Sequence, residues 1–386
     1  MSALEPLLSD EGWAYASAPP QEPGDPGRFH ALFGRDSLIT ALQVLPAAPE
    51  VARATLRALA ARQGRVTDPE VDEQPGKILH EYRPVAEPRF AEMGWPVRDG
   101  SLLYYGTADA TSWFLVVLAA LGDAALTAEL DGAWRAAGGW LAGALDAGGG
   151  LVRHGPRRHP GGLAQQGWRD SIAPVDRHPY GAGIVRPDGS APSTPLADAD
   201  SQAVAVAALD ALARLDPGGG WRDRATALRA RLSAWGAETM AEEGGGELVP
   251  GAGSQLGWLL WAEALEPAAA AAAADRLTAP DVLTPHGLRT LSARHPAFSP
   301  QAYHRGGVWP FDCWLGWGAL RAAGRAADAE RVRAGVLGAL DALGLAPELY
   351  AVGEDGALEP VPVANRVQAW TVGARWALEH DWDGRG

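Results

Sequence analysis

The stretch PFDCWLGWGALRAAGRAADAERVRAGVLGALDALG, residues 310–344, decides the fold class. Its apolar residues recur at intervals near 3.6 on both sides of a Gly-Arg dipeptide, and Gly344 stands where a left-handed residue would end a helix. The stretch therefore predicts two helices, at 310–323 and 326–343, joined by a tight turn. Such a hairpin needs neighbours that cover its apolar faces.

Paired helices recur along the whole chain, and runs of β-branched residues with period two are almost absent. Turns within a pair are short, whereas the gaps between pairs are long. Helices are also expected at 36–45, 50–63, 109–121, 124–146, 197–214, 221–240, 254–265, 267–277 and 368–380. This organisation predicts an all-α protein, an (α/α)6 barrel with first helices inside and second helices outside. The N-terminal segment or the C-terminal helix would complete an imperfect twelfth position. An α-solenoid would show a repeat of fixed length, and none is found.

The length, composition and net charge of the chain indicate its domain organisation and limit the classes of partner that it can bind. With 386 residues, of which 47% are apolar and 21% charged, the chain can form one large core, so we expect a single (α/α)6-barrel catalytic domain over residues 1–386. The net charge of -14 disfavours nucleic acids and anionic membranes. A signal-peptide pattern and a membrane-length apolar run are both missing, which predicts a cytoplasmic protein. The oligomeric state is unknown from the sequence.

Motifs for a metal or a nucleotide cofactor are not found. His80-Glu81 could begin a zinc-protease motif, but Pro84 stands at the place of the second histidine. The only cysteine, Cys313, falls in an apolar helix and is expected to be buried. A Gly-rich phosphate loop after a predicted strand is lacking too. We therefore expect no metal and no cofactor.

Two carboxylates with aromatic or apolar neighbours lie on loops. Asp170 follows a Gly-Trp-Arg sequence, and Glu348 stands between Pro347 and Leu349. Two carboxylates facing one cavity are the minimum equipment for hydrolysing a glycosidic bond. A partly desolvated carboxyl could protonate the leaving oxygen, and an ionised one could hold the attacking water. The alternatives are a helix-capping Asp170 and a solvated Glu348.

Other residues suit a neutral sugar. Arg35 and Asp36 together can donate to and accept from two adjacent hydroxyls, although an Arg beside an N-cap Asp is common. The 16 tryptophans offer flat apolar faces to pyranose rings, although most Trp residues lie in cores. A carbohydrate is thus the partner that the sequence favours.

Six motifs follow one another along the chain. They are LFGRDSLI (32–39), GKILHE (76–81), YYGTADAT (104–111), QGWRDS (166–171), YHRGGVWP (303–310), and PELY (347–350) with QAW (368–370). Together, and in this order, they resemble the bacterial glycogen-debranching amylo-α-1,6-glucosidase family. That family belongs to the six-hairpin glycosidases, with glucoamylase, trehalase and the glycoside hydrolases of family 63.

The resemblance implies an inverting glycosidase of the α-glucosidase type, with Asp170 as general acid and Glu348 as general base. It also implies that Arg35 and Asp36 grip the non-reducing-end sugar. Further residues at motif positions are expected to line the same subsite: Tyr105, Asp109, Trp168, His304, Trp309, Gln368 and Trp370.

The chain departs from the debranching pattern in two ways. Debranching members carry a β-rich domain ahead of the barrel, whereas here the barrel motifs start by residue 32. Arg305 replaces the usual Asn after the motif histidine, and its charge at the pocket rim would suit an anionic aglycone such as glycerate, as in the glucosylglycerate and mannosylglycerate hydrolases of family 63. The expected substrate is an α-glucan, an oligosaccharide or a small glycoside. A phosphorylase and a non-catalytic carbohydrate-binding protein are the rival interpretations.

Overall fold

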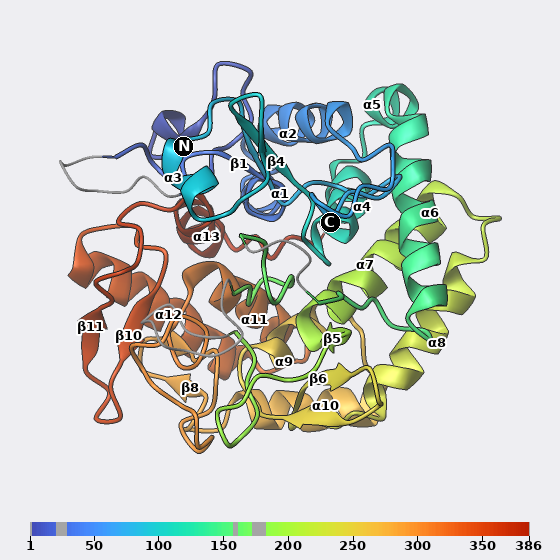
Figure 1. Ribbon diagram of the computed structural model, residues 1–386. Coiled ribbons are helices and arrows are strands. Elements are labelled where there is room, and N and C mark those ends of the chain that lie inside the picture. The colour runs from blue at the N-terminus through green and yellow to red at the C-terminus, as the bar shows by residue number, and fades with distance from the viewer. Residues whose placement is uncertain (1, 21–28, 157–160, 172–182, 386) are drawn as a thin grey trace.

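A closed ring of helices forms the centre of the protein (Figure 1), whose computed structural model describes residues 2–20, 29–156, 161–171 and 183–385. Each helix of the ring packs against the next, and the last packs against the first. In order these helices are α1 (Gly34–Gln43), α4 (Ala110–Leu121), α7 (Ala199–Leu215), α9 (Gln255–Trp261), α11 (Pro310–Ala322) and α13 (Ala369–Glu379). The predicted (α/α)6 toroid is confirmed.

A second layer of helices lies outside this ring, and each of its members packs on the inner helix that precedes it. These are α2 (Pro49–Ala61), α6 (Asp131–Ala147), α8 (Trp221–Ser233), α10 (Pro267–Leu277) and α12 (Ala326–Leu343). Pro49 and Pro267 open their helices, where a missing N–H leaves no hydrogen bond unmade. The N-terminal segment, with a short 3-10 helix at Glu5–Leu7, runs beside α13 and α1: Ala16 O accepts from Ala369 N–H.

Short antiparallel strands connect the motifs ahead of the inner helices. The largest sheet has the order β1 (Leu32–Phe33), β2 (Glu81–Arg83), β4 (Ser101–Tyr104), β3 (Val97–Arg98). Its register pairs Phe33 with Glu81 and Glu81 with Tyr104. The other strands are β5 (Leu196–Asp198), β6 (Thr239–Glu243), β7 (Leu248–Pro250), β8 (Leu283–Thr284), β9 (Gly287–Leu288), β10 (Tyr350–Val352) and β11 (Leu358–Pro360). The first sheet thus brings three sequence motifs side by side.

Three of the predicted helices are divided in the structure or differ from it by more than two residues at one end. The helix expected at 124–146 is divided at Leu130 into α5 (Ala124–Glu129) and α6. The helix expected at 221–240 stops at Ser233, because Gly236 turns left-handed (φ 75°) and the chain then pairs as β6 with β5. The helix expected at 254–265 stops at Trp261. A short helix, α3 (Pro88–Glu92), lies in an expected loop.

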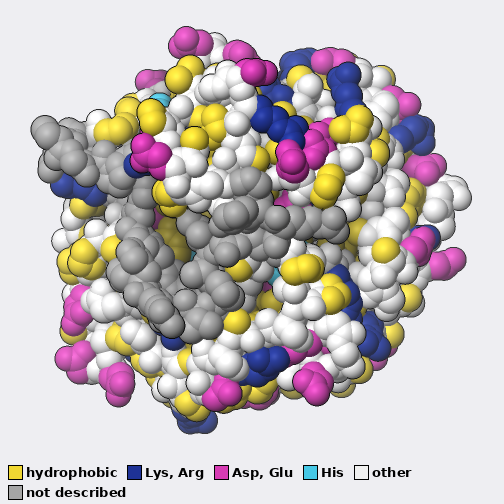
Figure 2. Space-filling view, in the orientation of Figure 1, with side chains coloured by type: hydrophobic (Ala, Val, Ile, Leu, Met, Phe, Trp, Pro, Cys, Tyr) yellow, Lys and Arg dark blue, Asp and Glu magenta, His cyan; other side chains and the backbone are white. Residues whose placement is uncertain are grey.

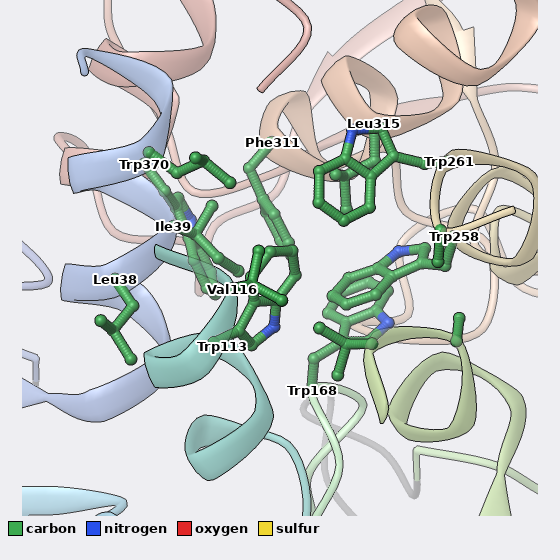
Figure 3. Close-up of a cluster of buried hydrophobic side chains, with 14 of the residues drawn as sticks. Leu38, Ile39, Trp113, Val116, Trp168, Trp258, Trp261, Phe311, Leu315 and Trp370 are labelled. Atoms are coloured by element: carbon green, nitrogen blue, oxygen red, sulfur yellow. The ribbon is translucent and has the colours of Figure 1, made fainter. Parts of the chain in front are cut away.

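Aromatic and aliphatic side chains fill the interior of the ring (Figure 3). Trp168 reaches this core from a loop and stacks on Trp258 of α9, with ring centroids 5.9 Å apart and planes inclined by 7°. The labelled side chains from the ring helices are Leu38, Ile39, Trp113, Val116, Trp258, Trp261, Phe311, Leu315 and Trp370. Because Trp168 is buried there, the loop that carries Asp170 is anchored in the core.

The two ends of the ring differ. The C-terminal tail binds the end where α1 and α9 finish: Trp382 Nε1 donates to Leu42 O, and Trp261 Nε1 donates to Asp383 O. The loops with the motifs therefore form the other end. Among the described residues visible in Figure 2, charged side chains lie mostly around the periphery of the face. Within the described ranges, helices with both the length and the apolar character to cross a bilayer are not found. Cys313 is buried, as expected.

Candidate active site

Four of the predicted site residues lie at the N-terminal ends of inner helices. Arg35 and Asp36 are in the first turn of α1, Asp109 immediately precedes α4, and Gln368 immediately precedes α13. Helix N-termini carry partial positive charge, so this end of the ring favours carboxylates. The expected loop residues therefore do meet at one end of the barrel.

A buried arginine joins two of the carboxylates. Arg35 is 4% exposed, and its Nη1 donates to both oxygens of Asp109, at 3.1 and 3.2 Å. Its Nη2 donates to Asp170 Oδ2 at 2.8 Å. Asp109 also accepts from the Thr107 hydroxyl. Arg35, which was expected to grip a sugar, thus holds the candidate general acid through Nη2.

Opposing effects set the protonation of Asp170. Its side chain is 26% exposed. Burial raises the pKa of Asp170 to about 6, while the adjacent Arg35 guanidinium opposes the rise and the charge of Asp109 adds to it. A carboxyl with such a pKa carries a proton in an appreciable fraction of molecules near neutral pH, which a proton donor requires.

Two neutral groups donate hydrogen bonds to Glu348. The residue is 2% exposed, and the Tyr303 hydroxyl donates to its Oε1. The backbone N–H of Asn365 donates to its Oε2 at 3.1 Å, and Glu348 N–H donates back to Asn365 O at 2.9 Å. Hydrogen bonds to both oxygens favour the ionised carboxylate. An ionised carboxylate is what a general base requires.

A line of hydrogen bonds runs from Glu348 to Asp36. Asn365 Nδ2 donates to Gln368 Oε1 at 3.0 Å, and Gln368 Nε2 donates to Asp36 Oδ1 at 3.3 Å. Burial raises the pKa of Asp36 to about 7, against the effect of neighbouring Arg35. Because Asn365 also binds Glu348, the network runs from the candidate base to the residue next to Arg35.

Four of the expected subsite residues form one packed aromatic cluster. His304 stacks on Trp309, with centroids 5.2 Å apart and planes inclined by 5°, and Trp168 meets His304 edge-on at 5.2 Å. Trp370 meets Trp309 at 5.9 Å. All four are buried, and burial keeps the pKa of His304 well below its usual value, so the ring is neutral. The ring faces of Trp168 and Trp370 stack on the core residues Trp258 and Phe311.

Two further expected residues have other contacts. The Tyr105 hydroxyl donates to the carbonyl of Arg62 at 2.7 Å, so it holds the chain after α2. Arg305, half-buried beside His304, places Nη1 at 3.4 Å from Ala297 O.

Groups of three or more His, Cys, Asp or Glu side chains placed to hold a metal ion are not found among the described residues.

Several residues of the site were not predicted from the sequence to have a function. Arg169 is fully buried and donates to Asp200 at 2.9 Å, to Ser254 Oγ and to Thr290 O, so it fixes the chain next to Asp170. Arg169 and Tyr303 stand inside two of the six motifs, which is the feature of the sequence that could have pointed to them. Asn365 lies outside every motif, so nothing in the sequence indicated its role.

Part of the chain is similar in sequence to a known family of domains. Residues 191–347 match the sequence model of the mannosylglycerate hydrolase MGH1-like glycoside hydrolase domain. The chain carries a glycoside hydrolase domain. The match begins after Asp170 and ends one residue before Glu348, so both carboxylates lie outside the matched segment. No curated protein matches the sequence.

Solved structures share the fold of the hydrolase. The GH63 mannosylglycerate hydrolase from Thermus thermophilus in complex with Tris and D-glycerate has a TM-score of 0.70 and 16% identity, over 98% of each chain. The same protein in complex with glucose gives 0.66 and 17%, also over 98% of each chain. A structure described as "Glycosidase Wild Type" gives 0.57 and 14%, over 100% of this chain and 95% of that one. At these identities the similarity establishes the six-hairpin fold.

Proposed function

We propose that this chain is an inverting glycosidase, with Asp170 as general acid and Glu348 as general base. The observation that carries the proposal is the difference between the two environments. Burial raises the pKa of Asp170 to about 6, whereas Glu348 accepts hydrogen bonds at both oxygens. Environments that push two carboxyl groups toward opposite protonation states assign one as acid and the other as base.

The reaction follows from these assignments. Asp170 transfers its proton to the glycosidic oxygen as the bond to the anomeric carbon breaks, through an oxocarbenium-like transition state. Glu348 removes a proton from a water that attacks the opposite face, so the product sugar has the inverted anomeric configuration. Arg35 holds Asp170 in place, and Asp36 with Gln368 offers acceptors and a donor to sugar hydroxyls.

For the substrate, we propose a small α-glycoside with an anionic aglycone, such as glucosylglycerate or mannosylglycerate. A mannosylglycerate hydrolase with D-glycerate bound is similar in fold over 98% of both chains. Arg305 supplies a positive charge beside His304. An α-glucosidase acting on α-1,6 branches is the second candidate, supported by the ordered motifs.

A substrate panel with product analysis tests the proposal. We expect hydrolysis of glucosylglycerate or mannosylglycerate to exceed that of isomaltose, trehalose and branched dextrin, and proton NMR to show the β-anomer of the released sugar first. An α-anomer released first would exclude inversion. Turnover that requires phosphate would indicate a phosphorylase, and sugar binding without turnover would indicate a binding protein.

Arg305→Ala tests the choice of aglycone. Loss of one partly exposed charge is worth up to about 1 kcal/mol. We therefore expect KM for the glycerate glycoside to rise by about 5-fold, while KM for a neutral alkyl glycoside of the same sugar stays the same. Arg305→Lys, which keeps the charge, is the control. An equal rise for both substrates would remove Arg305 from aglycone recognition.

A further inference from the structure

Asp72 occupies an unusual position in the loop between α2 and β2. Its backbone is left-handed (φ 56°), a conformation that non-glycine residues other than Asn and Asp seldom adopt. Its Oδ2 accepts from the Tyr104 hydroxyl at 2.9 Å and from Gln166 Nε2 at 3.1 Å. One carboxylate oxygen therefore joins strand β4 to the segment that contains Asp170.

The backbone around Asp72 is itself fixed. Lys77 Nζ donates to Asp72 O at 3.2 Å, and the N–H of Tyr105 donates to Val71 O at 2.8 Å. Lys77 is buried, with Nζ 5.8 Å from the centroid of the Trp140 ring. The Asp72 carboxylate thus stands on a rigid support.

Both partners of Asp72 hold the first half of the acid-bearing segment, residues 163–171. The Tyr104 hydroxyl accepts from Leu163 N–H at 3.0 Å. Gln166 is in the segment, and its carbonyl accepts from Ala108 N–H at 2.8 Å. The same hydroxyl that donates to Asp72 therefore binds the start of the segment.

The second half of the segment is held separately. Gln165 and Ser171 form an antiparallel bridge, Trp168 stacks in the core, and Arg169 binds Asp200. Asp170 lies inside this closed turn, and its own ion pair is with Arg35. If the first half of segment 163–171 moved, the turn between Gln165 and Ser171 would rotate about the buried Trp168. The Asp170 carboxyl would then be displaced.

We propose that Asp72 is a positioning residue for proton donation by Asp170, acting through Gln166 and Tyr104. The inference rests on the proposed function, since it assumes that Asp170 is the acid. Displacing a reacting group by about 1 Å can cost about 100-fold in rate. Removal of the Asp72 side chain should thus affect the proton-transfer step more than sugar binding.

The test compares two substrates of the same sugar and anomer, an alkyl glycoside and a glycosyl fluoride. Alkoxide departure needs a proton, whereas fluoride departs with much less assistance. Asp72→Gly removes the carboxylate and relieves the left-handed backbone. We expect it to lower kcat on the alkyl glycoside by about 10- to 100-fold, with KM nearly unchanged and kcat on the fluoride little affected.

Three further variants serve as comparisons. Asp72→Asn keeps an acceptor oxygen and tolerates the left-handed backbone, so it should restore most of the activity. Gln166→Met removes one of the same hydrogen bonds from the other side and should reproduce the substrate-selective loss. Asp99→Gly is the matched control, because Asp99 is also left-handed (φ 50°) but lies in the exposed β3–β4 turn. It should behave as wild type on both substrates.

The outcomes separate this inference from the proposed function. Equal losses on alkyl glycoside and fluoride in Asp72→Gly and Gln166→Met would show a general structural role, and no loss in either would show no role. Asp170→Asn is assayed in parallel. If that variant kept wild-type activity on the alkyl glycoside, the acid assignment itself would fall, whatever Asp72 does.

Discussion

In the acid-bearing segment, Asp170 keeps about a quarter of its side chain exposed and pairs with a buried arginine. In the base-bearing segment, residues 346–350, Glu348 is almost fully buried and accepts from a tyrosine hydroxyl and a backbone N–H. The acid therefore depends on a balance between burial and a neighbouring charge, whereas these two contacts of the base are neutral hydrogen-bond donors. A charge change nearby should disturb the acid more, and loss of a single donor should disturb the base more.

The largest effects should come from removing each carboxyl. Asp170→Asn and Glu348→Gln should each lower kcat on an alkyl glycoside by about 100- to 10,000-fold, since each removes an acid or base catalyst. On a glycosyl fluoride only Glu348→Gln should remain severely impaired, because water activation is still needed. Steady-state kinetics on both substrates, with circular dichroism to verify folding, measure this. Glu348→Gln with wild-type turnover of the fluoride would refute the base assignment.

A smaller effect is expected from the donor to the base. Tyr303→Phe removes the hydroxyl next to Glu348 Oε1 but keeps the ring, which meets Trp309 edge-on at 4.7 Å. A hydrogen bond to a charged group is worth about 1.5–3 kcal/mol, so kcat should fall by about 10- to 100-fold. Tyr105→Phe, which loses a hydroxyl bound to the Arg62 carbonyl, is the matched control. Equal losses in the two variants would mean that Tyr303 acts on stability alone.

The smallest effects should appear as shifts in pH dependence. Asp170 must be protonated to act, and its pKa is raised to about 6, so kcat/KM should decline as pH rises through about 6. Arg35 opposes that raised pKa and Asp109 adds to it. In Arg35→Met the decline should therefore move to higher pH, and in Asp109→Asn to lower pH. The midpoints of kcat/KM profiles measure both shifts, and shifts in the same direction would contradict this account of the site.

The sequence could predict much of the fold because helical hairpins are local. Apolar periodicity and the turn at Gly324 placed α11 and α12 within one residue of their bounds. The small sheets were not predicted, since strands of two to five residues are too short for a period-two pattern to stand out. The break at Gly236 also depends on pairing between β5 and β6, which lies outside any local window.

The candidate site could be predicted in its residues but not in their contacts. Arg35 and Asp109 are 74 positions apart, and Asp36 and Gln368 are 332 apart, so their pairing depends on closure of the ring. A motif indicates that Arg35 belongs near the sugar. It does not reveal that Nη1 and Nη2 bind two carboxylates, or that the tryptophans of the site pack on one another.

The burial of Lys77 makes the protein suited to chemical footprinting of one loop. Lys77 is the sole lysine of the chain, and burial lowers its pKa to about 8. In mildly alkaline solution its amine is neutral and nucleophilic, so access alone limits acylation. The rate at which an amine-reactive reagent modifies Lys77, followed by mass spectrometry, then reports how often the support of Asp72 opens in the otherwise folded protein.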